Sequence, residues 1–258
     1  MRKESENQAS NSVMEGMTSI RAILKAGGNS ASKITKILYD KDKIKKIGKE
    51  VGWLTHKGEE LGFAVEASSD AEMQSYTTGH SHGGIIAFTE PREIPMLGDA
   101  LHQIKAKGFY VMIEGIEDPY NFGYALRSLY AFGVDGIVLP MRNWMTAAGV
   151  VARASAGASE MVDLFRATPE EAADLFHGLG YQIVCAEENA EESLDEAALP
   201  LPIFAIVGGE RRGMSAVLKA KADKTVRIDY GREFQAFLSA ASAATVFGYE
   251  IAKQNKNR

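Results

Sequence analysis

Two segments of the chain place small and polar residues where a ligand could meet the main chain. In EDPYNFGYALRS, Asn121 and Arg127 stand six residues apart, just after an apolar run. In VGGERRGMS, Gly208 and Gly209 come directly before Glu210. Paired glycines let a ligand approach the backbone closely, and an amide, a guanidinium and a carboxylate can all hold polar groups. These residue types favour a site for a polar ligand.

A third segment, IDYGREFQAFLSAASAA (228–244), leads from a short apolar stretch through a turn into small residues. Taken singly, all three segments also have structural explanations. These are a helix cap at Asn121, a solvated helix face at Arg127, a turn at Gly208 and Gly209, a surface ion pair at Glu210, and close helix packing for residues 239–245.

Several chemistries are disfavoured by the residues present. Neither glycine segment has the spacing of a dinucleotide-binding loop or of a P-loop. Cys185 is the single cysteine, which excludes an internal disulfide and a zinc site built from several thiolates. His80 and His82 could bind a metal ion, but no third ligand is evident, so we expect a structural loop and no metal.

The elements that must position these segments alternate between apolar strands and helices. Strands are predicted at 109–116, 136–140, 181–187, 204–209 and 225–230, and helices at 121–133, 145–158, 214–222 and 234–254. Thr168 and Glu171 form a capping-box sequence before a further helix. This alternation predicts an α/β protein with a mostly parallel sheet, whose ligands gather at the carboxyl ends of the strands.

The chain divides into two predicted domains. Residues 13–90 alternate helix and strand as a compact module, TEPREIP (89–95) is typical of a linker, and residues 97–258 form the second domain. No apolar run approaches the length of a membrane span, and the start has no apolar stretch typical of a signal peptide. We therefore expect a cytoplasmic protein with no membrane association.

Charge is distributed unevenly along the 258 residues, although the net charge is only −5. Residues 1–60 hold 12 Lys and Arg against 8 Asp and Glu, whereas residues 160–200 hold 11 acidic residues against Arg166 alone. A polyanion such as RNA would be attracted to the first segment and repelled by the second. The lysine run at 41–50 is also compatible with a solvated helix face.

Taken together and in order, the motifs resemble the SpoU–TrmH family of RNA ribose 2′-O-methyltransferases, which belongs to the SPOUT superfamily. The resemblance lies in four segments, DPYNFGYALRSLYAFGVDGIVLP (118–140), VVARASAGASEM (150–161), IVGGERRGMS (206–215) and VRIDYGREFQAFLSAASAATVFGYE (226–250). It covers nearly the whole second domain. The first domain is similar to the substrate-binding domain of many such enzymes, which resembles a small RNA-binding ribosomal protein.

This resemblance implies a SPOUT-type parallel sheet with a C-terminal trefoil knot, a homodimer, and S-adenosylmethionine as cofactor. It implies RNA as substrate, and the first domain favours ribosomal RNA over transfer RNA. The implied catalytic residues are Arg127, Asn121 and Glu210. The implied cofactor-binding residues are Gly208, Gly209, Ile228, Tyr230, Leu238 and Ser239.

The third motif departs from the family pattern. The family usually has Ile-Pro-Met and then Ser-Leu-Asn, where this chain has Ile228-Asp229-Tyr230 and Phe237-Leu238-Ser239. The departure leaves open a noncatalytic RNA-binding or assembly factor on the same scaffold. A base methyltransferase from another SPOUT branch and a small-molecule α/β enzyme are also compatible with the sequence.

Overall fold

The computed structural model describes residues 13–26, 31–79, 82–141, 147–208, 214 and 216–256. The chain forms two compact units, which are residues 1–93 with 143–161 and residues 94–142 with 162–258. The sequence predicts one continuous domain over 97–258, whereas α6 and α7 pack with the first unit. The role of each unit stays a prediction.

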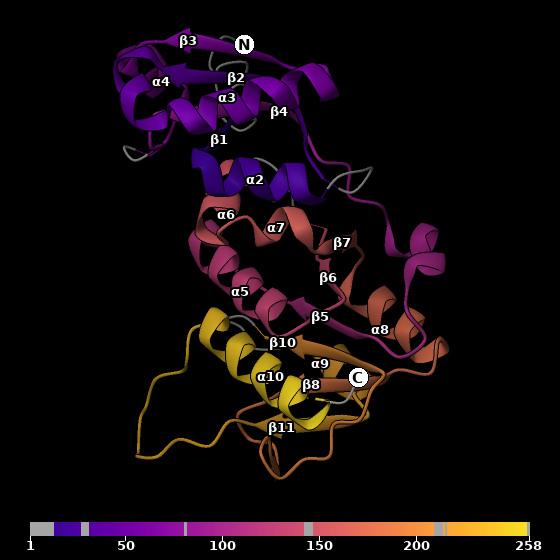
Figure 1. Cartoon of the computed structure of the whole chain (residues 1–258). Coiled ribbons are helices and arrows are strands. Elements are labelled where there is room, and N and C mark those ends of the chain that lie inside the picture. The colour runs from indigo at the N-terminus through magenta and orange to yellow at the C-terminus, as the bar shows by residue number, and fades with distance from the viewer. Residues whose placement is uncertain are drawn as a thin grey trace, which may run out of the picture. The chain divides into compact units, whose positions relative to one another are not determined.

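The first unit is a four-stranded sheet with helices on both faces (Figure 1). Its elements are β1 (Val13–Glu15), α2 (Gly16–Ala26), β2 (Lys33–Asp40), η1 (Lys41–Lys43), α3 (Ile44–Leu61), β3 (Ala64–Ser68), α4 (Asp70–Tyr76), β4 (Ile85–Glu90), α6 (Ala148–Ala154) and α7 (Ala158–Met161). The strand order is β1-β4-β2-β3, with β2 and β3 parallel and the other pairs antiparallel. The strand β1 is not predicted by the sequence pattern.

Side-chain alternation along the strands explains the layers of this unit. Ile37 of β2 packs in one apolar cluster with Ile47 and Leu54 of α3, whereas the next residue, Leu38, packs in another with Met73 of α4. Successive residues of a strand point to opposite faces, so α3 and α4 cover different faces of the sheet.

The helices α6 and α7 do not form the single helix predicted over 145–158. The chain turns between them, where Ala156 has φ 52° and Gly157 has φ +84°. Close packing requires two glycines here: a Cβ on Gly149 would lie 2.3 Å from the Val13 carbonyl oxygen, and one on Gly157 would lie 2.3 Å from the Ala22 Cβ. This small-residue segment therefore packs directly on β1 and α2.

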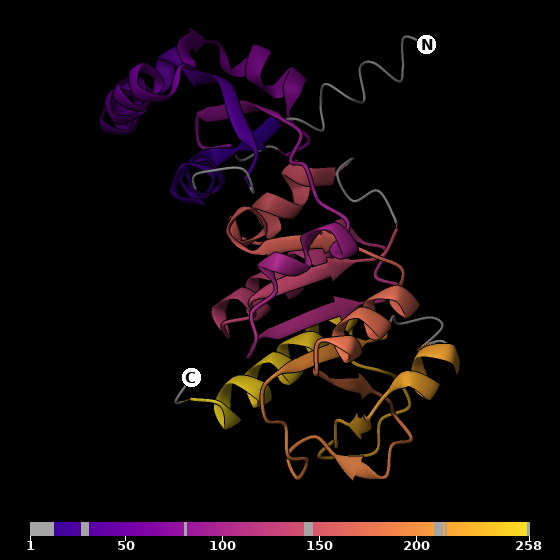
Figure 2. The same cartoon turned by 90° about the vertical axis from the view of Figure 1, so that its right-hand side faces the viewer.

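The second unit is built on a parallel sheet. Its elements are η2 (Leu97–Gln103), β5 (Phe109–Ile113), α5 (Pro119–Ala131), β6 (Gly136–Leu139), β7 (Asp163–Arg166), α8 (Pro169–Gly178), β8 (Gln182–Ala186), β9 (Glu192–Ser193), β10 (Ile203–Val207), α9 (Ala216–Lys221), β11 (Lys224–Arg227) and α10 (Ala240–Gln254). The described strands form one sheet in the order β7-β6-β5-β10-β8-β11-β9, and every pair is parallel. The arrows of β5 and β6 point the same way in Figure 2. The predicted parallel α/β sheet is confirmed.

Two boundaries near the C-terminus differ from the sequence prediction. The strand predicted over 225–230 ends at Arg227, and the helix predicted over 234–254 begins only at Ala240. The helix begins there because the Ser239 hydroxyl accepts the Ser242 amide at 3.2 Å and so caps its first turn. By contrast, the capping box of Thr168 and Glu171 is present as predicted. The trefoil knot stays a prediction.

None of the helices in the described ranges is both long enough and apolar enough to cross a membrane.

Candidate functional site

The first two predicted segments begin side by side at one edge of the second sheet. Strands β5 and β10 are parallel neighbours in which Ile113 pairs with Val207, the last residue of each strand. The Glu114 amide then donates a hydrogen bond of 2.9 Å to the Val207 carbonyl. The loop from Glu114 to α5 and the glycine segment at Gly208 therefore leave the sheet next to one another, where parallel sheets bind ligands.

The start of α5 is fixed by Asp118, not by Asn121. The Asp118 carboxylate accepts the Asn121 amide at 2.9 Å, and Pro119 occupies the first turn, where it needs no hydrogen-bond donor. The explanation of Asn121 as the helix cap is therefore wrong. Asn121 is half-buried in the first turn of α5.

Arg127 lies on the solvent-facing side of α5. Six helical residues place it about 9 Å along the axis from Asn121 and about 120° around it, so the two side chains do not share a face. Within the ranges that the structure describes, no hydrogen bond or ion pair of Arg127 is found. Its neighbours on this face are Tyr120 and Tyr124, which are 41% and 51% exposed.

The third segment leaves the same sheet from β11, on the other side of β8 from β10. Ile228 is half-buried, and Arg227 pairs with Asp229 at 2.7 Å. The Ser193 hydroxyl and the Arg227 guanidinium hold the pKa of Asp229 below its usual value. Asp229, which stands where the family usually has proline, thus remains an anion held by the last residue of β11 and by Ser193 of β9.

The loop that follows Asp229 returns on itself before α10. The Leu238 amide donates a hydrogen bond of 3.1 Å to the Tyr230 hydroxyl, which closes the loop. Residues 229–237 are exposed throughout, including Phe234 and Phe237, and Figure 1 shows this loop standing away from the sheet. Ser239 has a structural role as the cap of α10.

The small residues of α10 permit close packing against α5. Ala240, Ala241 and Ala244 are buried, and a Cβ on Gly248 would lie 3.0 Å from the Leu129 Cδ2. The structural explanation for these small residues is therefore confirmed. Because α5 lies within the first motif and most of α10 within the third, this packing also connects the two motifs.

Gly208 is half-buried at the end of β10, whereas the predicted residues Gly209 and Glu210 lie outside the described residues, as does His80. Burial raises the pKa of the Cys185 thiol to about 12, as expected for a thiol inside the apolar core. Among the described residues, no group of three or more His, Cys, Asp or Glu side chains could hold a metal ion.

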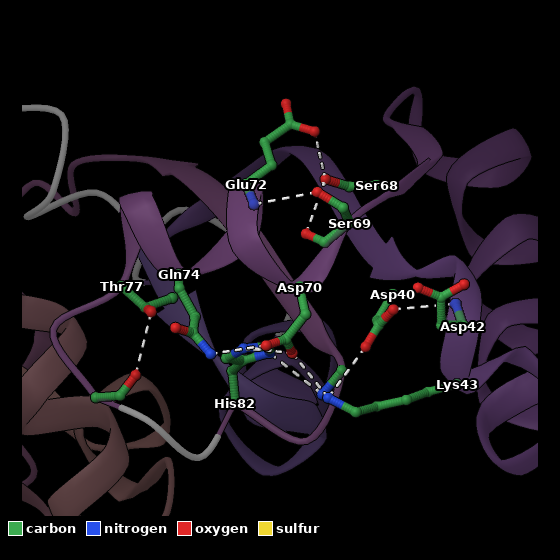
Figure 3. A network of polar contacts seen from close by, with 12 residues as sticks. Asp40, Asp42, Lys43, Ser68, Ser69, Asp70, Glu72, Gln74, Thr77 and His82 are labelled. Carbon is green, nitrogen blue, oxygen red and sulfur yellow. Dashed lines mark hydrogen bonds and ion pairs between the residues drawn. The ribbon is translucent and has the colours of Figure 1, made fainter.

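The first unit contains a polar network that the sequence does not predict. Lys43 donates to Asp70 at 2.8 Å and lies 3.0 Å from Asp40, and the His82 Nε2 lies 3.6 Å from Asp70 (Figure 3). The Lys43–Asp70 contact raises the pKa of Lys43 and lowers that of Asp70. His82 is buried, and its Nδ1 accepts the Gly84 amide at 3.2 Å. The network fastens the start of β4 to α4 and η1.

Solved structures with the same fold are RNA methyltransferases. The crystal structure of an RNA 2′-O ribose methyltransferase superposes with a TM-score of 0.76 and 21% identity, covering 95% of this chain and 88% of that chain. The SpoU methyltransferase AviRb from Streptomyces viridochromogenes, in complex with AdoMet, gives 0.77 and 20%, covering 95% and 90%. This chain shares its α/β fold with these methyltransferases.

Sequence comparison gives the family. Residues 108–249 match the SpoU rRNA Methylase family. A candidate TrmH family tRNA/rRNA methyltransferase from Staphylococcus haemolyticus (strain JCSC1435) is 33% identical over 175 residues, which are 66% of this chain and 70% of the relative. The chain belongs to the SpoU rRNA methylase family, and the resemblance drawn from its motifs is confirmed.

Proposed function

We propose that this protein transfers a methyl group from S-adenosylmethionine to a ribose 2′-oxygen in structured RNA, with ribosomal RNA favoured over transfer RNA. One observation carries the proposal: the first and second family motifs leave adjacent strand ends, joined by the Glu114–Val207 hydrogen bond. Family membership and the AdoMet complex of AviRb support it. The rRNA methylase family and the predicted RNA-binding domain at 13–90 favour ribosomal RNA.

The residues at these strand ends fit S-adenosylmethionine. Gly208 presents main-chain groups at a half-buried strand end, and Ile228 and Leu238 offer half-buried apolar surface for an adenine ring. Polar contacts would come from Gly209, Tyr230 and Ser239. When bound, the cofactor supplies a methyl group on a positively charged sulfur, which needs no metal to activate it.

Arg127, Asn121 and Glu210 would act on the RNA. A ribose hydroxyl is a poor nucleophile until it loses its proton, and a guanidinium is too weak a base to remove it. Arg127 would instead grip a neighbouring phosphate and stabilise the developing alkoxide through charged hydrogen bonds. The 2′-oxygen would release its proton to solvent water as it takes the methyl group, with S-adenosylhomocysteine as the leaving group. Asn121 would orient the ribose, and Glu210 would hold Arg127 or the substrate.

A homodimer is part of this proposal. Tyr120, Tyr124 and Tyr130 are exposed on the same side of α5 as Arg127, and Tyr249 is exposed on the adjacent α10. The rings of Tyr249 and Phe132 are 5.7 Å apart, so an aromatic contact joins α10 to the end of α5. A second copy seated there would cover the aromatic rings and bring Arg127 to the interface. We further propose the C-terminal trefoil knot and a cytoplasmic location.

The decisive experiment identifies the product nucleoside. The purified protein is incubated with labelled S-adenosylmethionine and RNA from cells that lack it, and the RNA is digested and analysed by mass spectrometry. We expect a 2′-O-methylated nucleoside and a matching site that is unmethylated in the deletion strain. A methylated base would favour the other SPOUT branch.

The second candidate function is a noncatalytic RNA-binding factor. It is favoured by Asp229, which pairs with Arg227 at the end of β11, and by Ser239, whose hydroxyl is engaged in capping α10. Calorimetry separates the two candidates, because only the methyltransferase must bind S-adenosylmethionine. No heat of binding at millimolar cofactor would favour the noncatalytic factor.

A further inference from the structure

Helix α3 has an exposed face with lysines that lack acidic partners. Lys45 and Lys49 are exposed one turn apart, with Lys41 and Lys46 beside them. In the part of the chain that the structure describes, no ion pair is found for any of the four. Their positive charge is therefore left uncompensated by the fold.

Other lysines of the same unit do have carboxylate partners. Lys33 lies 3.6 Å from Glu90, Lys36 lies 3.9 Å from Glu66, and Lys57 lies 2.5 Å from Glu60. The contrast shows that acidic side chains are placed against lysines elsewhere in this unit but not along the first half of α3.

The helical segment that carries these lysines begins with η1, which runs directly into α3. Its cap is Asp40, whose carboxylate accepts the Asp42 amide at 3.0 Å, and Asp42 is the acidic residue of its first turn. The first turn of α3 that follows contains no acidic residue, and Lys45 and Lys46 lie there.

Two glycines lie in the same part of the helix without a packing reason. Both Gly48 and Gly52 would meet nothing within 4 Å if a Cβ were added. Glycine in a helix interior is unfavourable relative to alanine, so neither residue is explained by the fold. Helical spacing sets the row Gly48–Gly52 beside the row Lys45–Lys49–Trp53, which leaves bare backbone next to the positive charges.

An aromatic ring completes this surface. Trp53 is 40% exposed, and the Arg21 guanidinium lies 5.8 Å from its ring centroid. An exposed tryptophan next to basic residues can stack on an unpaired base, as aromatic residues do in proteins that bind single-stranded nucleic acids.

We propose that the phosphate backbone of the substrate RNA binds to this face of α3, formed by Lys45, Lys46, Gly48, Lys49, Gly52 and Trp53, together with Lys41 of η1. The inference rests on the proposed function, because it assigns the RNA contact of that activity to one helix. The lysines neutralise phosphates, the glycines let the backbone approach the helix surface, and Trp53 stacks on a base. Residues 45–53 span about 12 Å along the axis, so the contact covers a short stretch of RNA.

The first test compares two double variants of the full-length protein that remove equal charge from the same unit. Binding to total RNA from cells lacking the protein is measured by filter retention at several salt concentrations. Lys45→Ala with Lys49→Ala should weaken binding at least tenfold and lower the salt slope by about 1.4 to 1.8, the value for two phosphate contacts. Lys33→Ala with Lys36→Ala should bind like the unaltered protein.

The second test separates binding from folding. Gly48→Ala with Gly52→Ala should raise Tm, because alanine favours the helix, yet weaken RNA binding, because two methyl groups occupy the surface that the backbone approaches. A more stable protein that binds RNA less well cannot be explained by unfolding.

Measuring RNA binding directly tests the role of α3 separately from methyl transfer. RNA binding that depends on Lys45 and Lys49 supports it even if no methyl transfer is detected. Methyl transfer by the unaltered protein, together with equal RNA affinity in both lysine variants, would overturn it while leaving the proposed function intact. A loss of affinity without any change in salt slope would overturn it as well, because the lysines would then not contact phosphates.

Discussion

At the scale of single residues, some of the predicted site residues have a structural role in the fold and others have none. Ser239 caps α10, and Asp229 is tied to Arg227, so both have structural reasons to be where they are. Arg127 has no such reason, because its side chain is exposed on α5 with no partner found in the described ranges. An unengaged guanidinium on the first family motif is the strongest single candidate for contact with RNA.

Arg127→Ala should therefore abolish most methyl transfer without affecting the fold. Alanine is a good helix former at an exposed position, so Tm should not fall. Loss of a group that stabilises a developing negative charge typically lowers kcat about 10²- to 10³-fold. The measurement is methyl incorporation into RNA at saturating cofactor, with calorimetry to confirm that S-adenosylmethionine still binds.

Arg127→Lys is the matched control, because it keeps the charge but loses the paired donors of the guanidinium. It should recover part of the activity. Unchanged turnover in Arg127→Ala would remove this residue from the mechanism.

At the scale of elements, the sequence predicts the strands and helix caps that depend on hydrophobic periodicity and on neighbouring residues. Buried strands such as β5 and β10 show as apolar runs, and the cap of α8 shows in Thr168 and Glu171. The start of α10 is missed because the apolar residues Phe234 and Phe237 extend the helical pattern into a loop where they are exposed. The break between α6 and α7 is missed because it depends on contacts with β1 and α2, which are more than 100 residues away in sequence.

The ion pair that connects α6 to β1 is also not predicted from the sequence, because its two residues are more than 100 positions apart. Arg153 lies 2.6 Å from Glu15, whose carboxylate also accepts the Thr78 and Gly79 amides at 3.2 and 3.1 Å. A Cβ on Gly79 would lie 1.6 Å from the Arg153 guanidinium, so a larger residue there would displace the Arg153 side chain. The identity of these residues follows from the tertiary contact and could not be inferred from either segment alone.

Arg153→Ala should consequently destabilise the protein. It leaves the buried Glu15 carboxylate without its positive partner, and breaking such a pair costs about 3 to 5 kcal/mol. Because the arginine side chain is 24% exposed, we expect a loss at the lower end of this range. The free energy of unfolding is measured by urea denaturation.

The control is Lys33→Ala, which removes a charge from an exposed pair in the same unit and should change stability by less than about 1 kcal/mol. Equal stability of the two variants would contradict the structural importance of the Arg153–Glu15 pair.

At the scale of the whole molecule, charge is distributed unevenly along the chain. The excess of basic residues lies in residues 1–60, whereas the acidic excess lies beyond them and includes residues 160–200. Charge alone would draw RNA to the first unit, although the family motifs lie mainly in the second. Arg127, the basic residue of the first motif, lies among exposed tyrosines. Because these tyrosines are proposed to form the dimer interface, the proposed catalytic residue would lie at that interface too.

Tyr124→Asp tests that connection. Tyr124 is 51% exposed, so an aspartate there should leave each protomer folded, but two copies of the new charge would be buried when two such surfaces meet around a twofold axis. The unaltered protein should elute with twice its chain mass of 28.0 kDa and the variant with the single mass, as measured by light scattering. Leu179→Asp, which changes another exposed apolar residue of the same unit, should remain dimeric.

If Arg127 works at the interface, the Tyr124→Asp monomer should also lose methyl transfer. A fully active monomer would show that one chain contains the complete site.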